Sequence, residues 1–174
     1  MKTEALEVLK NRRAIRAYKP DQITEEELNA VLEAGTYAPT GAGTQGVQIV
    51  AVQSPENVAA VDALNAKILN NPSAHPYYGA PTILLIFEME VCVTHELDGA
   101  AVCTNMLNAA YAVGLGSCWI HRCKQMFELP EGKALLKKWG LPETLVGVAS
   151  IALGYAACEQ PVAKPRKLDY IMKV

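Results

Sequence analysis

Long hydrophobic runs and blocks of basic residues are both missing from this 174-residue sequence. The longest apolar run is APTILLIF, which is far too short to cross a bilayer and predicts a buried strand instead. The formal net charge is −2, and the basic residues form no long block, so no global positive field attracts nucleic acid. Any anion site must therefore be local, and we expect neither a membrane nor a nucleic acid as partner.

Cysteine pairs are also missing. The five cysteines are an odd number, none forms a C-x-x-C pair, and no secretory signal precedes them. We interpret them as reduced thiols of a cytoplasmic protein. They are Cys92, Cys103, Cys118, Cys123 and Cys158.

The usual nucleotide and metal motifs do not occur. No G-x-G-x-x-G follows a predicted strand, no P-loop is present, and GAGTQG at 41–46 follows a helix and precedes a strand, the reverse of the required order. His75 and His95 have no cysteine or carboxylate at metal-ligand spacing, so we expect surface residues and no metal site. No internal repeat or low-complexity segment is visible.

What is present is a globular composition, with 51% apolar and 20% charged residues. The length fits one domain, residues 1–174. Thr24 and Glu27 match a capping box, and Ser54 with Pro55 marks another helix start. Helices are predicted at 3–11, 23–35, 54–70, 97–116 and 132–140, and strands at 47–52, 82–89, 117–120 and 144–156. The order favours an α+β fold, with an extended tail at 159–174.

Two basic clusters stand near the two ends of the chain. Arg12, Arg13 and Arg16 lie within five residues, and alone they favour a solvated helix face. Lys164, Arg166 and Lys167 lie in a proline-containing tail, and alone they favour a solubilising segment. If the termini meet, these cations surround one phosphate, because guanidinium groups suit phosphate oxygens.

Several blocks resemble the nitroreductase family of flavin enzymes, in the family's order and over nearly the whole chain. They begin with NRRAIRAYKPDQITEEELNAVLEAGTYAPTGAGTQGVQIVAV and continue with YGAPTILLIF, NMLNAAYAVGLGSCWIHR and GYAACEQPVAKPRKLDYI. The resemblance implies a mostly antiparallel sheet flanked by helices, with the C-terminal segment extended onto the partner of a homodimer. It also implies non-covalently bound FMN, which NAD(P)H reduces and a nitro compound, quinone or similar acceptor reoxidises in a ping-pong reaction.

The resemblance also implies the site residues, all of which bind the cofactor, because the flavin carries the chemistry. Arg12, Arg13 and Arg16 lie in the first motif, with Arg12 and Arg16 favoured as the phosphate and ribityl contacts, and Lys164 and Arg166 match the C-terminal phosphate contacts. Pro39, Thr40, Gly41 and Gln45 match the partner's loop against the ring, and Asn65 matches a contact to the pyrimidine edge. The N5 and O4 edge is expected beside Trp119, Ile120, His121 and Arg122, with the His121 backbone N–H as donor.

The chain departs from the family pattern at four positions. Ala14 replaces a serine of the first motif, Gly43 replaces an asparagine, and Gly46-Val47 replace Pro-Trp. Gly43 and Val47, in place of the asparagine and the tryptophan, make the loop smaller and favour slightly a flavin-binding or redox-sensing module without turnover. A dehalogenating or flavin-fragmenting relative is the other alternative, although the chain is too short for the usual lids.

The remaining polar residues have competing interpretations. Glu88 and Glu90 form either a metal pair or, as we favour, a strand end that reaches solvent. Cys118 is expected to be a core thiol rather than a nucleophile. Tyr77 and Tyr78 border the substrate slot or pack their loop, and the His121 imidazole is an acid, a ring contact or an exposed loop side chain.

Overall fold

Strand β2 (Thr82–Glu88) lies inside the molecule with all seven residues buried. Its apolar side chains alternate between two separate clusters. Ile83, Leu85 and Phe87 belong to one cluster, whereas Leu84 and Ile86 belong to the other. Because successive strand residues point to opposite faces, a strand that is apolar on both faces requires cover on both sides of the sheet.

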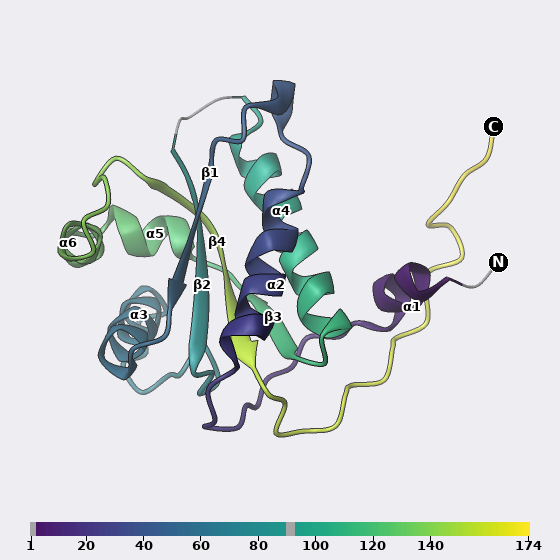
Figure 1. Ribbon diagram of the computed structural model, residues 1–174, viewed down its shortest axis with the longest axis horizontal. Coiled ribbons are helices and arrows are strands. Elements are labelled where there is room, and N and C mark those ends of the chain that lie inside the picture. The colour runs from purple at the N-terminus through teal and green to yellow at the C-terminus, as the bar shows by residue number, and fades with distance from the viewer. Residues whose placement is uncertain (1–2, 90–92) are drawn as a thin grey trace.

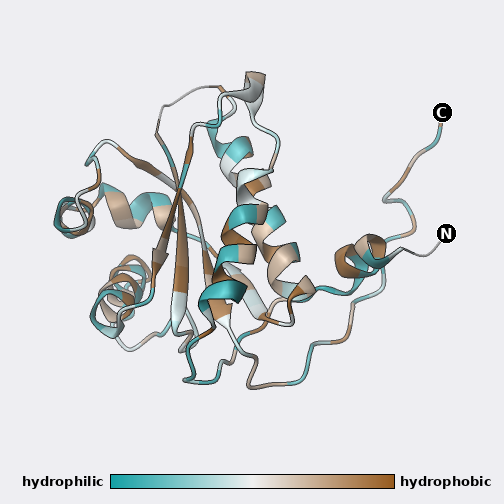
Figure 2. Cartoon of the chain, in the orientation of Figure 1, coloured by the Kyte–Doolittle hydropathy of each residue, from teal (hydrophilic) through white to brown (hydrophobic). Residues whose placement is uncertain are grey.

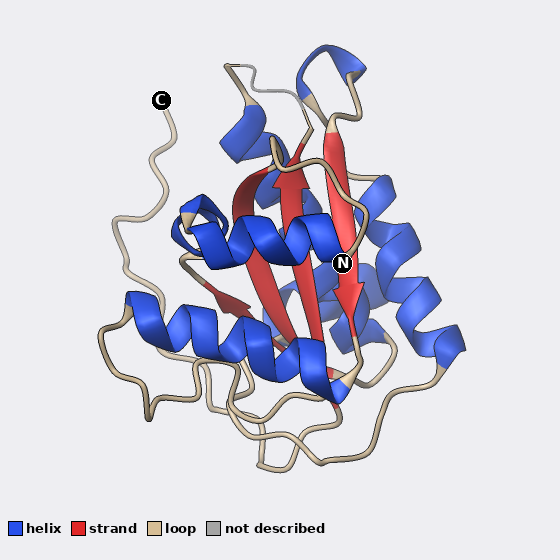
Figure 3. Cartoon of the chain, turned by 90° about the vertical axis from the view of Figure 1, so that its left-hand side faces the viewer, coloured by secondary structure: helices blue, strands red, loops and turns tan. Residues whose placement is uncertain are grey.

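Helices supply this cover in two layers (Figures 1 and 3). The structure is a computed structural model that describes residues 3–89 and 93–174. Helices α3 (Pro55–Ile68), α5 (Cys123–Glu128) and α6 (Pro130–Lys138) cover one face, and α2 (Glu25–Thr36) and α4 (His95–Ala112) cover the other. Helix α1 (Glu4–Asn11) lies at the margin of the second layer. Figure 2 shows the apolar colour concentrated on the central strands between these layers.

The sheet has four antiparallel strands in the order β1-β2-β4-β3. Strands β1 (Val47–Val52) and β3 (Gly116–Ile120) are its edges, and β4 (Val146–Gly154) lies beside β2. The chain segment after α1 pairs with the outer edge of β3, where the Ile15 N–H donates to the Ser117 carbonyl over 3.0 Å. The described residues thus form a four-stranded sheet with six α-helices, which confirms the α+β prediction.

Most helix boundaries follow local signals that are legible in the sequence. The Thr24 hydroxyl accepts from the Glu27 N–H, and the Glu27 carboxylate accepts from the Thr24 N–H, so the predicted capping box is present. At α3 the Ser54 hydroxyl accepts from the Asn57 N–H, which is a simple cap without the reciprocal bond. Helix α5 was not predicted, because its six residues are too few to display helical periodicity. The loop before β1 contains one short 3-10 turn, η1 (Gly41–Gly43).

The two ends of the chain run side by side before they leave the body of the molecule (Figure 1). The Ala157 N–H donates to the Ala17 carbonyl over 2.9 Å, and the Gln160 side-chain amide donates to the Asn11 carbonyl over 2.7 Å. The C-terminal tail therefore starts out along the segment that follows α1, between Asn11 and Ala17. No helix in the described ranges is long and apolar enough to span a membrane.

Candidate functional site

A cavity of about 450 Å³ lies between α1, α4 and the edge strand β3. Four residues predicted for the cofactor site line it, namely Arg12, Ala14, Arg16 and Trp119. The other lining residues are Leu9, Thr104, Leu107, Asn108 and Cys118. Thr104 and Asn108 were missed by the sequence analysis, although their spacing of four residues places both on one face of α4.

The charges that line the cavity favour an anion. No carboxylate in residues 3–89 and 93–174 forms an ion pair with Arg12 or Arg16. The Arg13 guanidinium is engaged elsewhere, because its Nη1 donates to the carbonyls of Lys10 and Arg12, each over 2.7 Å. Of the three clustered arginines, two thus line the cavity and Arg13 fastens the end of α1.

The apolar wall of the cavity is formed by Trp119 and Cys118. Trp119 is 37% exposed, unusually accessible for a large side chain inside a strand. Cys118 is buried, as predicted for a core thiol, and burial raises the pKa of its thiol although Arg16 and Arg12 oppose that shift. Cys118 is therefore a neutral thiol and not an activated nucleophile.

The segment after Trp119 turns sharply beside the cavity. His121 is exposed, and Arg122 adopts a left-handed conformation with φ 81°. Asn65 binds this turn from the interior: its Nδ2 donates to the His121 carbonyl over 3.1 Å, and its Oδ1 accepts from Arg122 Nε over 2.7 Å. Asn65 is 0% exposed and does not line the cavity, so its expected contact with the ring stays a prediction.

The loop of Pro39, Thr40, Gly41 and Gln45 lies away from this cavity, at the opposite end of α4 (Figure 1). The Gly41 N–H donates to both carboxylate oxygens of Asp98, over 3.0 and 3.1 Å, and the Gln45 N–H donates to the Thr40 hydroxyl over 3.0 Å. The fold thus brings the arginines and Trp119 together in one chain, but does not add the loop to them.

The basic tail residues are not lining residues of the cavity either. Lys164 and Arg166 are exposed, and Arg166 Nε donates to the Lys164 carbonyl over 3.1 Å. The apolar residues of the same tail are exposed as well. Leu168, Tyr170, Ile171 and Met172 are each at least 77% accessible. Apolar side chains in this number are typical of a segment that packs against another molecule.

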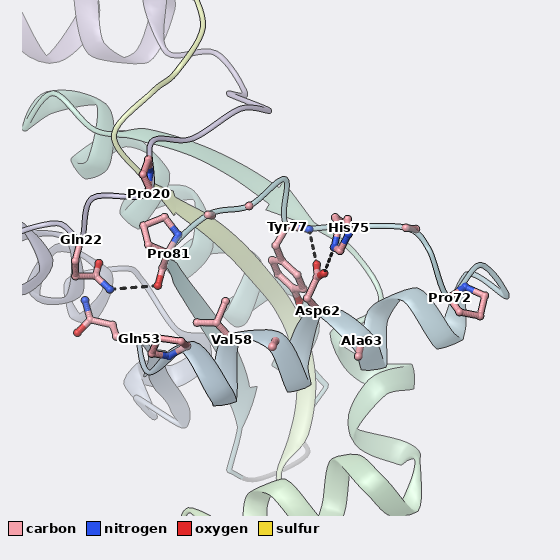
Figure 4. Close-up of a pocket in the computed structure, with 15 residues that line it drawn as sticks. Pro20, Gln22, Gln53, Val58, Asp62, Ala63, Pro72, His75, Tyr77 and Pro81 are labelled. Atoms are coloured by element: carbon pink, nitrogen blue, oxygen red, sulfur yellow. Dashed lines mark hydrogen bonds and ion pairs between the residues drawn. The ribbon is translucent and has the colours of Figure 1, made fainter.

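A larger cavity, of about 700 Å³, opens between α3 and the loop that precedes β2 (Figure 4). It contains none of the residues predicted to bind the cofactor, although Tyr77 lines it. Its charged group is Asp62, whose carboxylate accepts from the Tyr77 N–H and from His75 Nδ1, over 3.1 and 2.9 Å. A carboxylate repels a phosphate, so this cavity is unsuited to a phosphorylated cofactor. Figure 4 shows Asp62, His75 and Tyr77 turned toward one another along one wall.

Glu88 departs from its prediction. It was expected at a strand end that reaches solvent, but it is 1% exposed and its Oε1 has no hydrogen-bond partner among the described residues. Burial first, and then the nearby Asp98, raise the pKa of Glu88 from 4.5 to about 7, against the opposing effects of His95 and the Gly99 N–H. Glu90, the other member of the suggested metal pair, lies outside the described residues. No group of three or more metal-ligating side chains occurs in the described ranges.

Comparisons with known proteins agree with this fold. A model of the Nitroreductase family matches residues 9–155. A crystal structure of a nitroreductase with bound FMN from Bacteroides fragilis superimposes with a TM-score of 0.92 at 31% identity, over 99% of this chain and 100% of that one. A relative from Archaeoglobus fulgidus, provisionally named NADH dehydrogenase/NAD(P)H nitroreductase, is 28% identical over 90% of this chain and 88% of its own length. FMN reductase (NADPH) from Bacillus subtilis is 23% identical over 87% of this chain and 66% of its own length.

Glu88 makes stability depend on pH. Its folded-state pKa of about 7 exceeds the ordinary 4.5, so the folded protein holds a proton that the unfolded chain releases between these values. Stability therefore falls as the pH rises through that window. We expect Glu88→Gln to be more stable than the wild type at pH 8 by about 1–3 kcal/mol, and nearly equal to it at pH 4.5.

Urea unfolding at a series of pH values measures this difference. Glu26→Gln, at an exposed helix position, is the control and should stay within about 0.5 kcal/mol of the wild type throughout. A difference between Glu88→Gln and wild type that does not change with pH contradicts the assignment.

Proposed function

The chain belongs to the nitroreductase family, and on this premise we propose that it is an oxidoreductase that binds FMN non-covalently and uses NAD(P)H to reduce nitro compounds, quinones or similar acceptors. The observation that carries the proposal is the cavity with two arginines and no balancing carboxylate among the described residues. FMN carries a phosphate dianion and a flat ring, which need cations at one end and an apolar wall at the other.

The phosphate end is assigned to Arg12 and Arg16. Each guanidinium offers several donors in a planar fork, and each charge-assisted hydrogen bond contributes roughly 1.5–3 kcal/mol. Arg13 is left out of this assignment because its side chain already donates to two backbone carbonyls. Ala14, where the family has serine, lines the cavity with a methyl group and supplies no hydroxyl.

The ring end is assigned to Trp119 and the turn that follows it. FMN held there would supply the redox chemistry between NAD(P)H and the acceptor. This chain's own contribution is to hold the ring against an apolar wall and to present backbone donors at its edge. The Cys118 thiol remains protonated and takes no part in the reaction.

The complete site requires a second copy of the chain. The loop of Pro39, Thr40, Gly41 and Gln45 lies too far along α4 to line the cavity of its own chain. A partner in a homodimer supplies that loop instead, and the apolar residues of the C-terminal tail pack on the partner. Lys164 and Arg166 of the same tail then complete the phosphate site. The single domain of residues 1–174 is the unit that pairs.

Purified protein incubated with FMN tests the proposed function. We expect a yellow dimer by sedimentation at micromolar concentration, which bleaches with NADH or NADPH and recovers its colour when a nitroarene or quinone is added. A protein that takes up no FMN refutes the proposal. A yellow protein that neither coenzyme bleaches is a flavin-binding module without turnover, and refutes the enzymatic part alone.

The arginine assignment predicts a graded loss of affinity. Arg12→Ala and Arg16→Ala should each weaken FMN binding by about 10- to 100-fold, since each variant loses a charge-assisted hydrogen bond. Fluorescence titration of apo-protein measures the change. The matched control is Arg13→Ala, which removes a neighbouring arginine from the same cluster and should change the affinity less than threefold. Equal losses in all three variants contradict the assignment.

A further inference from the structure

A chain of buried polar side chains connects α3 with the end of β3. Asn65, Tyr77 and Ser150 are each at most 1% exposed, and they come from three segments that are distant in the sequence. Asn65 Nδ2 lies 3.4 Å from the Tyr77 hydroxyl, that hydroxyl lies 2.8 Å from Ser150 Oγ, and Ser150 Oγ lies 3.0 Å from the Ile120 carbonyl. Buried polar groups are costly unless they are paired, so these three side chains hold a particular backbone arrangement.

The groups at the two ends of this series of side chains determine which atom donates in each hydrogen bond. A carbonyl only accepts, so the Ser150 hydroxyl donates its proton to Ile120. Ser150 Oγ must then accept from Tyr77, whose hydroxyl stays protonated because burial raises the pKa of Tyr77 far above 10. The Tyr77 oxygen in turn accepts from Asn65, whose second amide proton goes to the His121 carbonyl. Two successive carbonyls, those of Ile120 and His121, are thus held from the interior.

A hydrogen bond that fixes the direction of one residue's carbonyl also fixes the direction of the next residue's N–H. In a trans peptide the carbonyl of one residue and the N–H of the next point in opposite directions, and the described chain has no cis peptide bond. Since Ser150 lies opposite Ile120 on β4, the Ile120 carbonyl points into the sheet and the His121 N–H points beyond the free edge of β3. No hydrogen-bond partner for the His121 N–H occurs within the described ranges.

The alternation of the strand supports this direction independently. On an edge strand, the backbone groups of every second residue point outward. The Ser117 carbonyl points outward, because it accepts from Ile15 on the outer side. Trp119 follows the same alternation, so its N–H lies on the side of Ile15 and of the cavity lined by Arg12, Arg16 and Trp119. The His121 N–H lies on that side as well because it points away from the Ile120 carbonyl, whereas the His121 carbonyl turns inward to Asn65.

The turn itself is fastened by Asn65. A non-glycine residue with a positive φ is strained by about 1–2 kcal/mol, and Arg122 at φ 81° is such a residue. The bond of 2.7 Å from Arg122 Nε to Asn65 Oδ1, together with the bond from Asn65 Nδ2 to the His121 carbonyl, offsets that strain. Asn65 therefore stabilises the turn that follows the strand.

We propose that Ser150 and Asn65 are positioning residues, which hold the Ile120 and His121 carbonyls from inside the protein and thereby aim the His121 N–H at the N5 edge of the flavin. The inference rests on the proposed function, because it concerns the same cofactor site. It gives Asn65 a role that its complete burial permits: the side chain acts on the ring through the backbone and does not touch it.

Spectroscopy of the bound cofactor tests the inference without reference to turnover. Protein loaded with FMN that is labelled with ¹⁵N at N5 reports a hydrogen bond at that atom through its nitrogen resonance, and amide exchange reports the same bond from the His121 side. We expect Ser150→Ala to move the N5 resonance toward that of a ring without a donor, and to speed His121 exchange at least tenfold in the loaded protein. Asn65→Leu should act in the same direction.

Tyr77→Phe is the matched control. It deletes a buried hydroxyl from the same chain of side chains, but it leaves the Ser150 and Asn65 contacts to the two carbonyls in place. It should keep the N5 resonance of wild type and change His121 exchange less than threefold. An unmoved resonance in Ser150→Ala, or the same movement in Tyr77→Phe, overturns the inference. Failure of wild-type protein to take up FMN refutes the proposed function, and the inference with it.

Discussion

The constraint on which the structure depends is the burial of β2 from both sides. Its apolar residues alternate between two clusters, so helices must cover both faces of the sheet. With the faces closed, a ligand has access to the sheet only at its edges. At one of these, β3, the chain after α1 pairs as far as Ser117 and leaves the backbone beyond it open. The cavity lies at this opening, and the same pairing brings the arginines to it.

Charge then distinguishes the two cavities. The larger one is lined by Asp62 and contains no arginine or lysine, whereas the smaller one is lined by Arg12 and Arg16 without a balancing carboxylate in the described part of the chain. Size alone would have selected the wrong cavity for a phosphorylated cofactor. The slight negative net charge of the protein is consistent with this, because two unpaired guanidinium groups act over a few ångströms and need no global field.

The features predicted best from the sequence are those that a few neighbouring residues determine. The capping box of Thr24 and Glu27 and the cap at Ser54 concern three or four consecutive positions, and both are present. Glu88 was misjudged because Gly46 and the first turn of α4, with Asp98 and Gly99, lie against the end of β2, and strand alternation cannot reveal such neighbours. The hydrogen bonds of Asn65 could not be predicted because its partners, His121 and Arg122, follow more than fifty residues later. The family resemblance already favoured Arg12 and Arg16 over Arg13, and the geometry of the helix end adds a physical reason, because the Arg13 side chain donates to backbone carbonyls there.

The central claim, that Arg12 and Arg16 hold the phosphate of FMN, is tested most directly by comparing FMN with riboflavin. The two ligands have the same ring and ribityl chain and differ by the phosphate alone. Two charge-assisted hydrogen bonds of roughly 1.5–3 kcal/mol each correspond to at least a 100-fold difference in affinity. Isothermal titration of wild-type protein should therefore show FMN binding at least 100-fold more tightly than riboflavin. Affinities within threefold of each other would contradict the account.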